Sequence, residues 1–398
     1  MTVRVLYIDV NCKNSSTGML VYTLYQGLEK SGHSAAVCYG RGTKIKEKNI
    51  FKFGIDLETF LHAGLTRLTG FTGCYSFIST LRLINYIRKY KPDIVHIHEM
   101  HAYFINIGML IHYLKKHHMK TVMTLHCEFA YTGKCGHALE CEKWKTECNH
   151  CPHKHDYVNT GFFDHTRYMF RKKKKFFSDY PELVLVTPSI WLTERVEQSF
   201  FKNHRIHTIY NGINTDIFYP KRGVAERDRL HLAENEKVIL ALAPHLMSSA
   251  KGGMFILQLA KKLKNYKFIL VGVDEFDFEV DENVLPFGAI YDKDYLASLY
   301  SIADLFVICS EKETFSLTCA EAICCGTTVA GFRCGAPESV FDEPFATFVE
   351  YGNIDKLENV IINKINSPLD RKYIASYGYE NFSEKNMLCE YLTLYNSI

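Results

Sequence analysis

The sequence predicts an α/β protein with two domains, each built on a parallel β-sheet that carries helices on both faces. The chain has 398 residues, which is too long for one ordinary core and suits two domains of about 150 to 200 residues. Short apolar runs alternate with stretches of helical period, a pattern typical of parallel sheets. A turn-rich segment at residues 210–223 separates two such series and suits a linker.

Nine apolar runs are candidate strands, and stretches between them have the spacing of amphipathic helices. The strands are expected at residues 3–10, 35–39, 94–98, 121–125, 183–187, 238–243, 268–273, 305–309 and 328–332. Helices are expected at residues 19–30, 76–89, 104–117 and 254–263. In parallel sheets of this kind ligands bind at the carboxyl ends of the strands, so we expect functional residues in the loops that follow them.

Composition and charge are those of a soluble globular protein. Hydrophobic residues make up 47% and charged residues 23%, and the net charge is only +3. The segment MTVRVLYIDV is interpreted as a strand, because it lacks the long apolar core and the small-residue cleavage site of a signal peptide. No apolar run approaches the ~20 residues that span a bilayer. We therefore expect a cytoplasmic protein whose fourteen cysteines are mostly reduced.

The segment ETFSLTCAE, residues 313–321, is the most informative motif. It places Glu313 and Glu321 on either side of a predicted helix start, directly after the apolar run at 305–309. Ser316 is a natural N-cap, so free backbone N–H groups are expected between the two carboxylates, and that end of a helix attracts phosphate. The arrangement suits a sugar joined to a nucleoside through a diphosphate. A helix with a solvated glutamate at each end is the ordinary alternative, which the strand–turn–helix context disfavours.

Six motifs in order resemble the GT-B glycosyltransferases of the large retaining family four. They are NSSTGMLVYTLYQGLEKSGH (14–33), KPDIVHIHEMH (91–101), TLHCEF (124–129), TPSIWLTERV (187–196), IYNGINTDIFYP (209–220) and the segment from Glu313 with the following CGAPESV. The resemblance covers essentially the whole chain and implies two Rossmann-like domains facing each other across a cleft. It implies an acceptor domain at 1–205 with a cysteine-rich insertion at 127–180, a nucleotide-sugar domain at 206–378, and a helix at 379–398 that packs back on the first.

The resemblance also implies roles for individual residues. Glu313 would position the hydroxyls of the donor sugar, and Glu321 would accept hydrogen bonds from the nucleotide ribose. Lys251 would neutralise the leaving diphosphate, and His126 would reach toward the sugar being transferred. The other implied donor-binding groups are Gly18, His245 and the backbone N–H groups of Phe315, Ser316 and Leu317.

Two positions depart from the family pattern. His245 stands where arginine is usual, so it is a phosphate cation only when a nearby diphosphate raises its pKa. Cys127 stands where aspartate is more usual. Retention in such enzymes is attributed to same-face attack assisted by the leaving phosphate, so Glu313 is expected to position the sugar and not to act as a nucleophile. The resemblance implies no catalytic metal, and we find no Asp-x-Asp element suited to one.

A cluster of cysteines in CGHALECEKWKTECNHCP is the second strong feature. Four thiolates at such spacings can form a tetrahedral structural zinc site, with nearby histidines as substitutes. The cysteines are Cys135, Cys141, Cys148 and Cys151, and the histidines are His137, His150 and His153. Packed reduced thiols are one alternative, and disulfides in an oxidising compartment are another; the clustering favours zinc. A similar insertion in some family-four enzymes that build exopolysaccharides such as colanic acid implies an envelope or capsule role.

A basic stretch, RYMFRKKKKFF, follows at residues 167–177. Basic residues interleaved with aromatic ones can bind an anionic membrane surface, or the diphosphate of a lipid-linked acceptor. A solvated helix face is the ordinary alternative. Nucleic acid is a poorer partner, because the net charge is small and no binding motif is present.

These patterns together predict a transferase that moves a hexose from a nucleotide diphosphate sugar to a saccharide or polyprenyl-diphosphate-linked acceptor. The product would belong to a bacterial capsule, exopolysaccharide or lipopolysaccharide, made at the inner face of the plasma membrane. An enzyme of another type on the same fold, such as a nucleotide-sugar epimerase or a phosphorylase, is one alternative. A catalytically inactive scaffold that binds zinc and membrane is the other, and the presence together of Glu313, Glu321, Lys251 and His126 argues against it.

Overall fold

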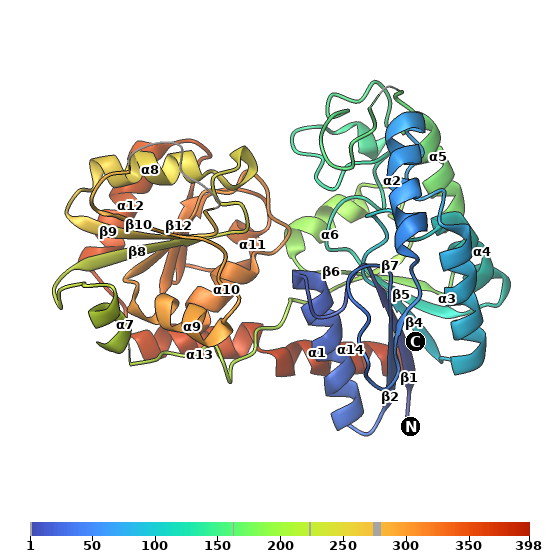
Figure 1. Cartoon of the computed structure of the whole chain (residues 1–398), viewed down its shortest axis with the longest axis horizontal. Coiled ribbons are helices and arrows are strands. Elements are labelled where there is room, and N and C mark those ends of the chain that lie inside the picture. The colour runs from blue at the N-terminus through green and yellow to red at the C-terminus, as the bar shows by residue number, and fades with distance from the viewer. Residues whose placement is uncertain (1, 162, 223, 274–279) are drawn as a thin grey trace. The chain divides into compact units, whose positions relative to one another are not determined.

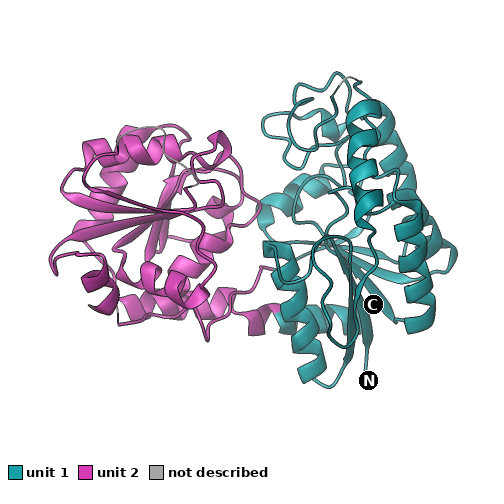
Figure 2. Cartoon of the chain, viewed as in Figure 1, with its two compact units in different colours: residues 1–209, 388–398 teal, residues 210–387 magenta. Residues whose placement is uncertain are grey.

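The computed structural model describes residues 2–161, 163–222, 224–273 and 280–398, and the chain divides into two compact units (Figure 2). Unit 1 comprises residues 1–209 and 388–398, and unit 2 comprises residues 210–387. The chain therefore enters unit 2 after Ile209 and returns to unit 1 at Leu388. The boundaries expected from the sequence, at residues 205 and 378, lie four and nine residues before the observed ends at 209 and 387.

Unit 1 contains a seven-stranded parallel sheet in the order β3-β2-β1-β4-β5-β6-β7 (Figure 1). Its strands are β1 (Arg4–Asp9), β2 (Ser34–Tyr39), β3 (Ile50–Lys52), β4 (Ile94–Ile97), β5 (Lys120–Thr124), β6 (Leu183–Thr187) and β7 (Arg205–Thr208). Its helices are α1 (Ser16–Lys30), α2 (Asp56–Thr69), α3 (Phe77–Tyr90), α4 (Ile107–Lys116), η1 (Lys143–Lys145), α5 (Thr166–Phe177) and α6 (Ile190–Glu197).

Unit 2 contains a six-stranded parallel sheet in the order β10-β9-β8-β11-β12-β13. Its strands are β8 (Lys237–Leu242), β9 (Tyr266–Val271), β10 (Val284–Phe287), β11 (Leu305–Ile308), β12 (Thr328–Phe332) and β13 (Ala346–Val349). Its helices are α7 (Val224–Arg229), η2 (Ser249–Lys251), α8 (Gly253–Lys262), α9 (Lys293–Ile302), α10 (Leu317–Cys324), α11 (Pro337–Val340), α12 (Ile354–Asn366) and α13 (Arg371–Phe382). Helix α14 (Glu384–Ser397) begins in unit 2 and continues into unit 1.

Strands with both faces covered are those that the sequence predicted. All nine expected strands are present. They could be recognised in the sequence because helices cover both faces of the central strands, which are therefore apolar throughout; residues 5–8 of β1, for example, are fully buried. The edge strands β3, β7, β10 and β13 were missed, since they are short and partly exposed and lack a continuous apolar run.

Each sheet has one position at which its connections change direction. In unit 1 this position lies between β1 and β4, and in unit 2 between β8 and β11. Ligands of open parallel sheets bind at such switch points, beyond the carboxyl ends of the strands. The loops after β1, β4, β8 and β11 are therefore where the fold places functional residues.

Helix α14 packs on the sheet of unit 1 through two buried tyrosines. The hydroxyl of Tyr395 lies 2.6 Å from Nδ1 of His96, and that of Tyr391 lies 2.9 Å from the hydroxyl of Thr124. Among the described residues, no helix is both long enough and apolar enough to cross a bilayer.

Candidate functional site

Unit 2 brings Lys251 and Glu313 together at its switch point. Lys251 ends η2 in the loop after β8, and Glu313 lies in the loop after β11. The Lys251 ammonium and the Glu313 carboxylate are 2.7 Å apart and both partly exposed. A hydrogen bond from the N–H of Glu311 to the carbonyl of Ala250, 2.9 Å long, joins the two loops. The pair thus combines a cation with an acceptor at the place where the fold binds ligands.

The backbone of both loops is fixed. Gly252, directly after Lys251, has φ +70°, and a Cβ there would lie 2.2 Å from the carbonyl oxygen of Cys309, so this turn requires glycine. The Glu313 N–H donates to the carbonyl of Cys334 at 2.8 Å, and the Glu313 carbonyl accepts from the N–H of Ala336 at 3.0 Å. The charged pair is therefore held by backbone contacts on both sides.

The start of α10 has the features of an anion site. Ser316 is the N-cap, as predicted, and its hydroxyl accepts a hydrogen bond from the N–H of Cys319 at 3.4 Å. Among the described residues, the backbone N–H groups of Phe315, Ser316 and Leu317 have no acceptor. These three donors begin two residues after Glu313, so a bound phosphate would meet both them and the Lys251 side of the loop.

Glu321 lies inside α10 and is partly buried in unit 2. The hydroxyl of Tyr300 on α9 donates to its Oε2 at 2.9 Å. Burial raises the pKa of Glu321 to about 7, against the Tyr300 hydrogen bond and the charge of Lys293, which both lower it. His245, the remaining predicted cation, is exposed in the same loop as Lys251 and has φ +51°.

The predicted residues of unit 1 lie at the switch point of that unit. Gly18, in the first turn of α1, donates its N–H to the hydroxyl of the N-cap Ser15 at 3.0 Å. A Cβ at Gly18 would lie 2.9 Å from that oxygen and 3.0 Å from the carbonyl of Asn11, so the close packing of the loop already requires glycine. His126 follows β5, and its Nε2 lies 3.0 Å from Nδ1 of His98, which follows β4.

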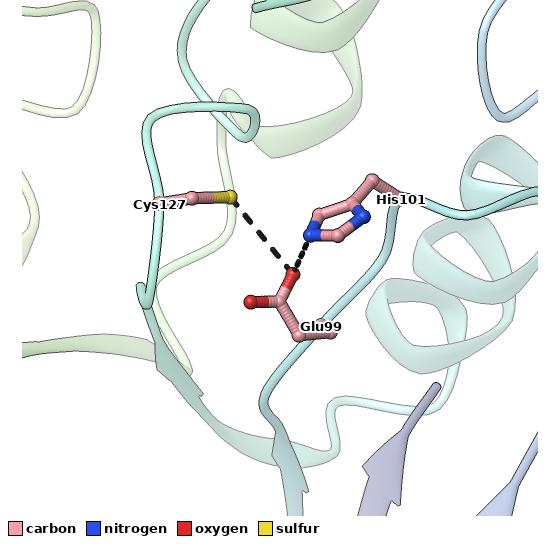
Figure 3. Close-up of side chains that lie close together, drawn as sticks. All are labelled: Glu99, His101 and Cys127. Atoms are coloured by element: carbon pink, nitrogen blue, oxygen red, sulfur yellow. Dashed lines mark hydrogen bonds and ion pairs between the residues drawn. The ribbon is translucent and has the colours of Figure 1, made fainter. Parts of the chain in front are cut away.

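Sequence reasoning missed a cluster formed by Glu99, His101 and Cys127 (Figure 3). Glu99 Oε2 lies 2.5 Å from His101 Nε2 and 3.9 Å from Cys127 Sγ. Burial alone would lower the pKa of His101, but the Glu99 carboxylate raises it well above its usual range. In the part of the chain that the structure describes, this is the one group of three potential metal ligands whose atoms all lie within 4.8 Å of one another.

Of these three residues, only Cys127 was singled out from the sequence. His101 pairs with the buried Glu99, and its Nδ1 lies 2.8 Å from the Tyr157 hydroxyl. Cys127 had been noted as the residue that replaces an aspartate. Asp9, at the end of β1, also went unnoticed; it is fully buried, and burial together with the charge of Glu99 raises its pKa to about 8.

The four clustered cysteines line one cavity of about 20 Å³. Cys135 donates its S–H to Cys151, and the N–H of Gly133 points to Cys148 Sγ at 3.2 Å. Within the described part of the chain, no three of the four sulfur atoms lie within 4.8 Å of one another. All fourteen cysteines of the chain are free thiols, so the disulfide alternative is wrong for this structure.

The basic stretch at 167–177 forms α5, but not all of its charges are available. Lys173 is fully buried and donates to the carbonyls of Phe129 and Thr132, so its expected place on an exposed basic face is wrong. The helix packs with a period that buries Met169, Phe170, Lys173 and Phe177. Both arginines of the stretch, Arg167 and Arg171, pair with Glu147.

Known proteins resemble the chain over its whole length. The profile described as Glycosyltransferase Family 4 matches residues 17–217, and the profile Glycosyl transferases group 1 matches residues 225–381. A protein of Escherichia coli K12 named as a colanic acid biosynthesis glycosyl transferase, WcaC, is 22% identical over 99% of this chain and all of its own length. The N-acetyl-alpha-D-glucosaminyl L-malate synthase of Bacillus anthracis is 24% identical over 49% of this chain and 55% of its own.

Solved structures show the same fold. Sucrose-phosphate synthase of Thermosynechococcus elongatus aligns with a TM-score of 0.72 at 17% identity, over 99% of this chain and 98% of its own. HepE of Anabaena, solved with UDP, aligns with a TM-score of 0.68 at 13% identity, over 99% of this chain and all of its own. The fold is therefore GT-B, as predicted, with two parallel α/β sheets. Since the family 4 profile alone spans half of the chain and the group 1 profile most of the remainder, the chain belongs to the family 4 glycosyltransferases.

Proposed function

We propose that this protein is a retaining glycosyltransferase that transfers a hexose from a nucleotide diphosphate sugar to a saccharide carried on a polyprenyl diphosphate. The observation that carries the proposal is the Lys251–Glu313 pair, which adjoins the N–H groups of residues 315–317 at the switch point of unit 2. HepE, which shares the fold, has been solved with UDP-glucose, so a UDP-hexose is the first donor to test. The similarity to WcaC supports a product in an envelope polysaccharide.

Charge development during transfer assigns the roles. Cleavage of the sugar–phosphate bond leaves negative charge on the diphosphate, which Lys251 and the N–H groups at the start of α10 are placed to stabilise. When Lys251 turns to the phosphate, the Glu313 carboxylate is released to accept hydrogen bonds from sugar hydroxyls. Glu321 would accept hydrogen bonds from the ribose, and the His245 side chain would be a further contact for the diphosphate. His126 of unit 1 would serve the sugar being transferred.

Nucleotide binding tests the donor site. In a thermal-shift assay, UDP and UDP-hexoses should raise the melting temperature of the protein, because a ligand that binds only the native state stabilises it by mass action. Lys251→Ala should abolish the shift, and Lys261→Ala, an exposed lysine on α8, is the matched control. If no nucleotide of the UDP, GDP or ADP series raises the melting temperature, the inactive scaffold is favoured.

Product analysis tests the chemistry. With a lipid-linked acceptor extract, wild-type protein should release UDP in a donor-dependent reaction, and Glu313→Ala should fold normally and release none. Retention predicts that the new glycosidic bond has the anomeric configuration of the donor, which proton NMR of the product measures. An inverted configuration would contradict the assigned mechanism while leaving the transferase assignment intact.

The cysteine cluster is proposed to bind structural zinc. Two lysines are buried near it: Lys134 donates to three backbone carbonyls, and Lys173 donates to two and lies 3.3 Å from the centroid of the Phe129 ring. Within the described ranges neither forms an ion pair. A buried ammonium without a counter-charge is costly. Zinc bound by four thiolates carries two negative charges overall, which the two lysines would balance. The cavity, lined by all four cysteines, has about the volume of one bound atom.

Metal analysis tests this site. Wild-type protein should contain one zinc per chain, and the double substitution Cys148→Ser, Cys151→Ser should remove it and lower the melting temperature. Cys389→Ser is the matched control, since Cys389 is exposed and lies outside the cluster. Unchanged zinc content in the double variant would refute the assignment.

A further inference from the structure

Helix α2 has its polar side chains buried and its apolar ones exposed. The buried residues are Thr59, His62 and Thr66. The exposed ones, from 40% exposed at Leu65 to 74% at Phe60, are Leu57, Phe60, Leu61, Leu65 and Leu68. These five positions follow helical spacing and form one stripe. A surface helix of a soluble protein normally has the opposite arrangement, so this stripe needs an apolar partner.

Polar contacts fix the helix in this orientation. His62 Nδ1 lies 2.7 Å from the Ser76 hydroxyl, and the Thr66 hydroxyl donates to the carbonyl of Phe71 at 3.1 Å. Glu58 accepts from the N–H groups of Ile78 and Ser79 at the start of α3, each at 2.8 Å. Turning the stripe inward would break these hydrogen bonds, of which the one between His62 and Ser76 is buried, so it stays outside.

The stripe continues onto the neighbouring helix. Phe77, Ile78 and Leu81, in the first turns of α3, are also about half exposed or more. The Glu58 hydrogen bonds hold this end of α3 beside the start of α2. We call these eight side chains the apolar face. Single exposed apolar residues are ordinary, but eight on two joined helices mark an interaction site.

In unit 1, α3 and α5 lie beside α2, and α4 contacts both α3 and α5 (Figure 1). Helices α3, α4 and α5 contain three, two and six lysines and arginines respectively, and no aspartate or glutamate. The end of α2 touches the start of α5, where the carbonyl of Thr69 lies 2.6 Å from Nδ1 of His165. A groove of about 860 Å³ between α4 and α5 is lined by Lys115, Lys116, Arg171, Lys172 and Lys175, together with aromatic side chains.

We infer that the apolar face and these basic helices dock unit 1 on an anionic lipid bilayer. Apolar side chains of α2 and α3 would enter the boundary of the acyl chains, while exposed cations such as Lys174 and Lys175 would meet lipid phosphates. A second copy of the chain fits less well, because a two-fold contact through this face would bring the same cations of both copies together. The inference does not depend on the proposed transferase activity.

This assignment changes which residues carry the membrane contact. The sequence pointed to residues 167–177 alone, where Lys173 is buried and two arginines are paired with Glu147. The structure adds α2, which was not among the helices expected from the sequence, as the part that would enter the lipid. The basic helices would then attract the anionic headgroups, while the apolar side chains of α2 and α3 would be buried in the lipid.

Vesicle sedimentation with the full chain tests the inference. The protein should pellet with vesicles of phosphatidylcholine and phosphatidylglycerol, and much less with phosphatidylcholine alone. The double substitution Phe60→Ser, Leu61→Ser should weaken binding at least about tenfold, because both side chains lose apolar burial. Tyr291→Ser, at a position 90% exposed in unit 2, is the control and should bind like wild type.

A second pair of variants separates the charge contribution. Lys174→Gln with Lys175→Gln should weaken binding to anionic vesicles about tenfold, with Lys261→Gln and Lys264→Gln as the matched control. Normal melting temperatures and nucleotide shifts would show that the variants fold. Equal pelleting of wild type and the Phe60 variant would overturn the inference. The inference would also be overturned if the wild-type protein did not bind vesicles but formed a dimer in analytical ultracentrifugation that the Phe60 variant did not form.

Discussion

Replacing Glu321 by glutamine should make the ligand-free protein more stable at pH 8 and leave its stability at pH 5 nearly unchanged. Burial raises the pKa of this carboxyl from 4.5 to about 7. Below pH 4.5 both folded and unfolded chains hold the proton. Between pH 4.5 and about 7 only the unfolded chain ionises, so the folded state loses stability over this range. At about 1.4 kcal/mol per unit, the ionised carboxylate costs about 3 kcal/mol of folding free energy at pH 8.

Glutamine cannot ionise and so avoids this cost. The Tyr300 hydroxyl, which donates to Glu321 Oε2 at 2.9 Å, can donate equally to the amide oxygen. The NH₂ group of glutamine replaces a carboxyl oxygen, and burying this donor without an acceptor costs about 1 kcal/mol of folding free energy. The net gain of about 2 kcal/mol corresponds to about 4–8 °C in the melting temperature of a unit of this size.

The assay is a thermal shift at pH 5, 6, 7 and 8, with and without UDP, that follows the transition which UDP raises. Glu321→Gln should melt higher than wild type at pH 8 and should lose most of the UDP-induced shift, since an amide oxygen is a weaker acceptor for ribose hydroxyls than a carboxylate. Glu234→Gln, an exposed loop position in unit 2, is the control. Equal effects of Glu321→Gln at pH 5 and pH 8 would refute the reasoning, because they would show that ionisation of this group is not linked to folding.

Three further changes test the packing around the sites. Glu128→Ala should lower the free energy of unfolding by about 3–5 kcal/mol in urea titrations, because it leaves the Arg195 guanidinium, 2.7 Å away, largely buried without its partner; a loss under 1 kcal/mol would contradict this. Gly252→Ala should cost at least about 1 kcal/mol and weaken nucleotide binding, since φ +70° and a contact of 2.2 Å forbid a Cβ; unchanged calorimetry and affinity would show that the turn relaxes. Glu99→Gln should destabilise more at pH 6 than at pH 9, because His101 has a raised pKa and its pairing is lost as pH rises through that value; a pH-independent loss would exclude the ion pair as the cause.

The sequence allowed prediction of features that depend on strong local patterns. Central strands were found because burial on both faces demands continuous apolar runs, and α10 was found because Ser316 and Gly326 mark its ends. Helix α2 escaped because the usual rule assigns apolar residues to the interior, and here the buried face is polar. Lys173 was misplaced for a related reason: within a run of four lysines nothing marks the one that faces inward.

The candidate site could be predicted only in part from local pattern. The two glutamates and the helix start between them form a local motif, which can be recognised directly in the sequence. Lys251 is far from Glu313 along the chain, and only the resemblance to a family assigned both to one donor site; the ion pair of 2.7 Å between them was not predicted. Glu99, His101 and Cys127 come from the ends of two neighbouring strands, so their contact depends on strand order, which no local pattern encodes.

The return of the chain to unit 1 has a consequence for biosynthesis. Residues 388–398 supply Tyr391 and Tyr395, which hydrogen-bond to Thr124 and His96, yet a ribosome makes them only after all of unit 2. During translation His96 on β4 and Thr124 on β5 therefore lack these hydrogen-bond partners until unit 2 has been synthesised. Unit 1 would reach full protease resistance after unit 2, although its first strand is made earliest.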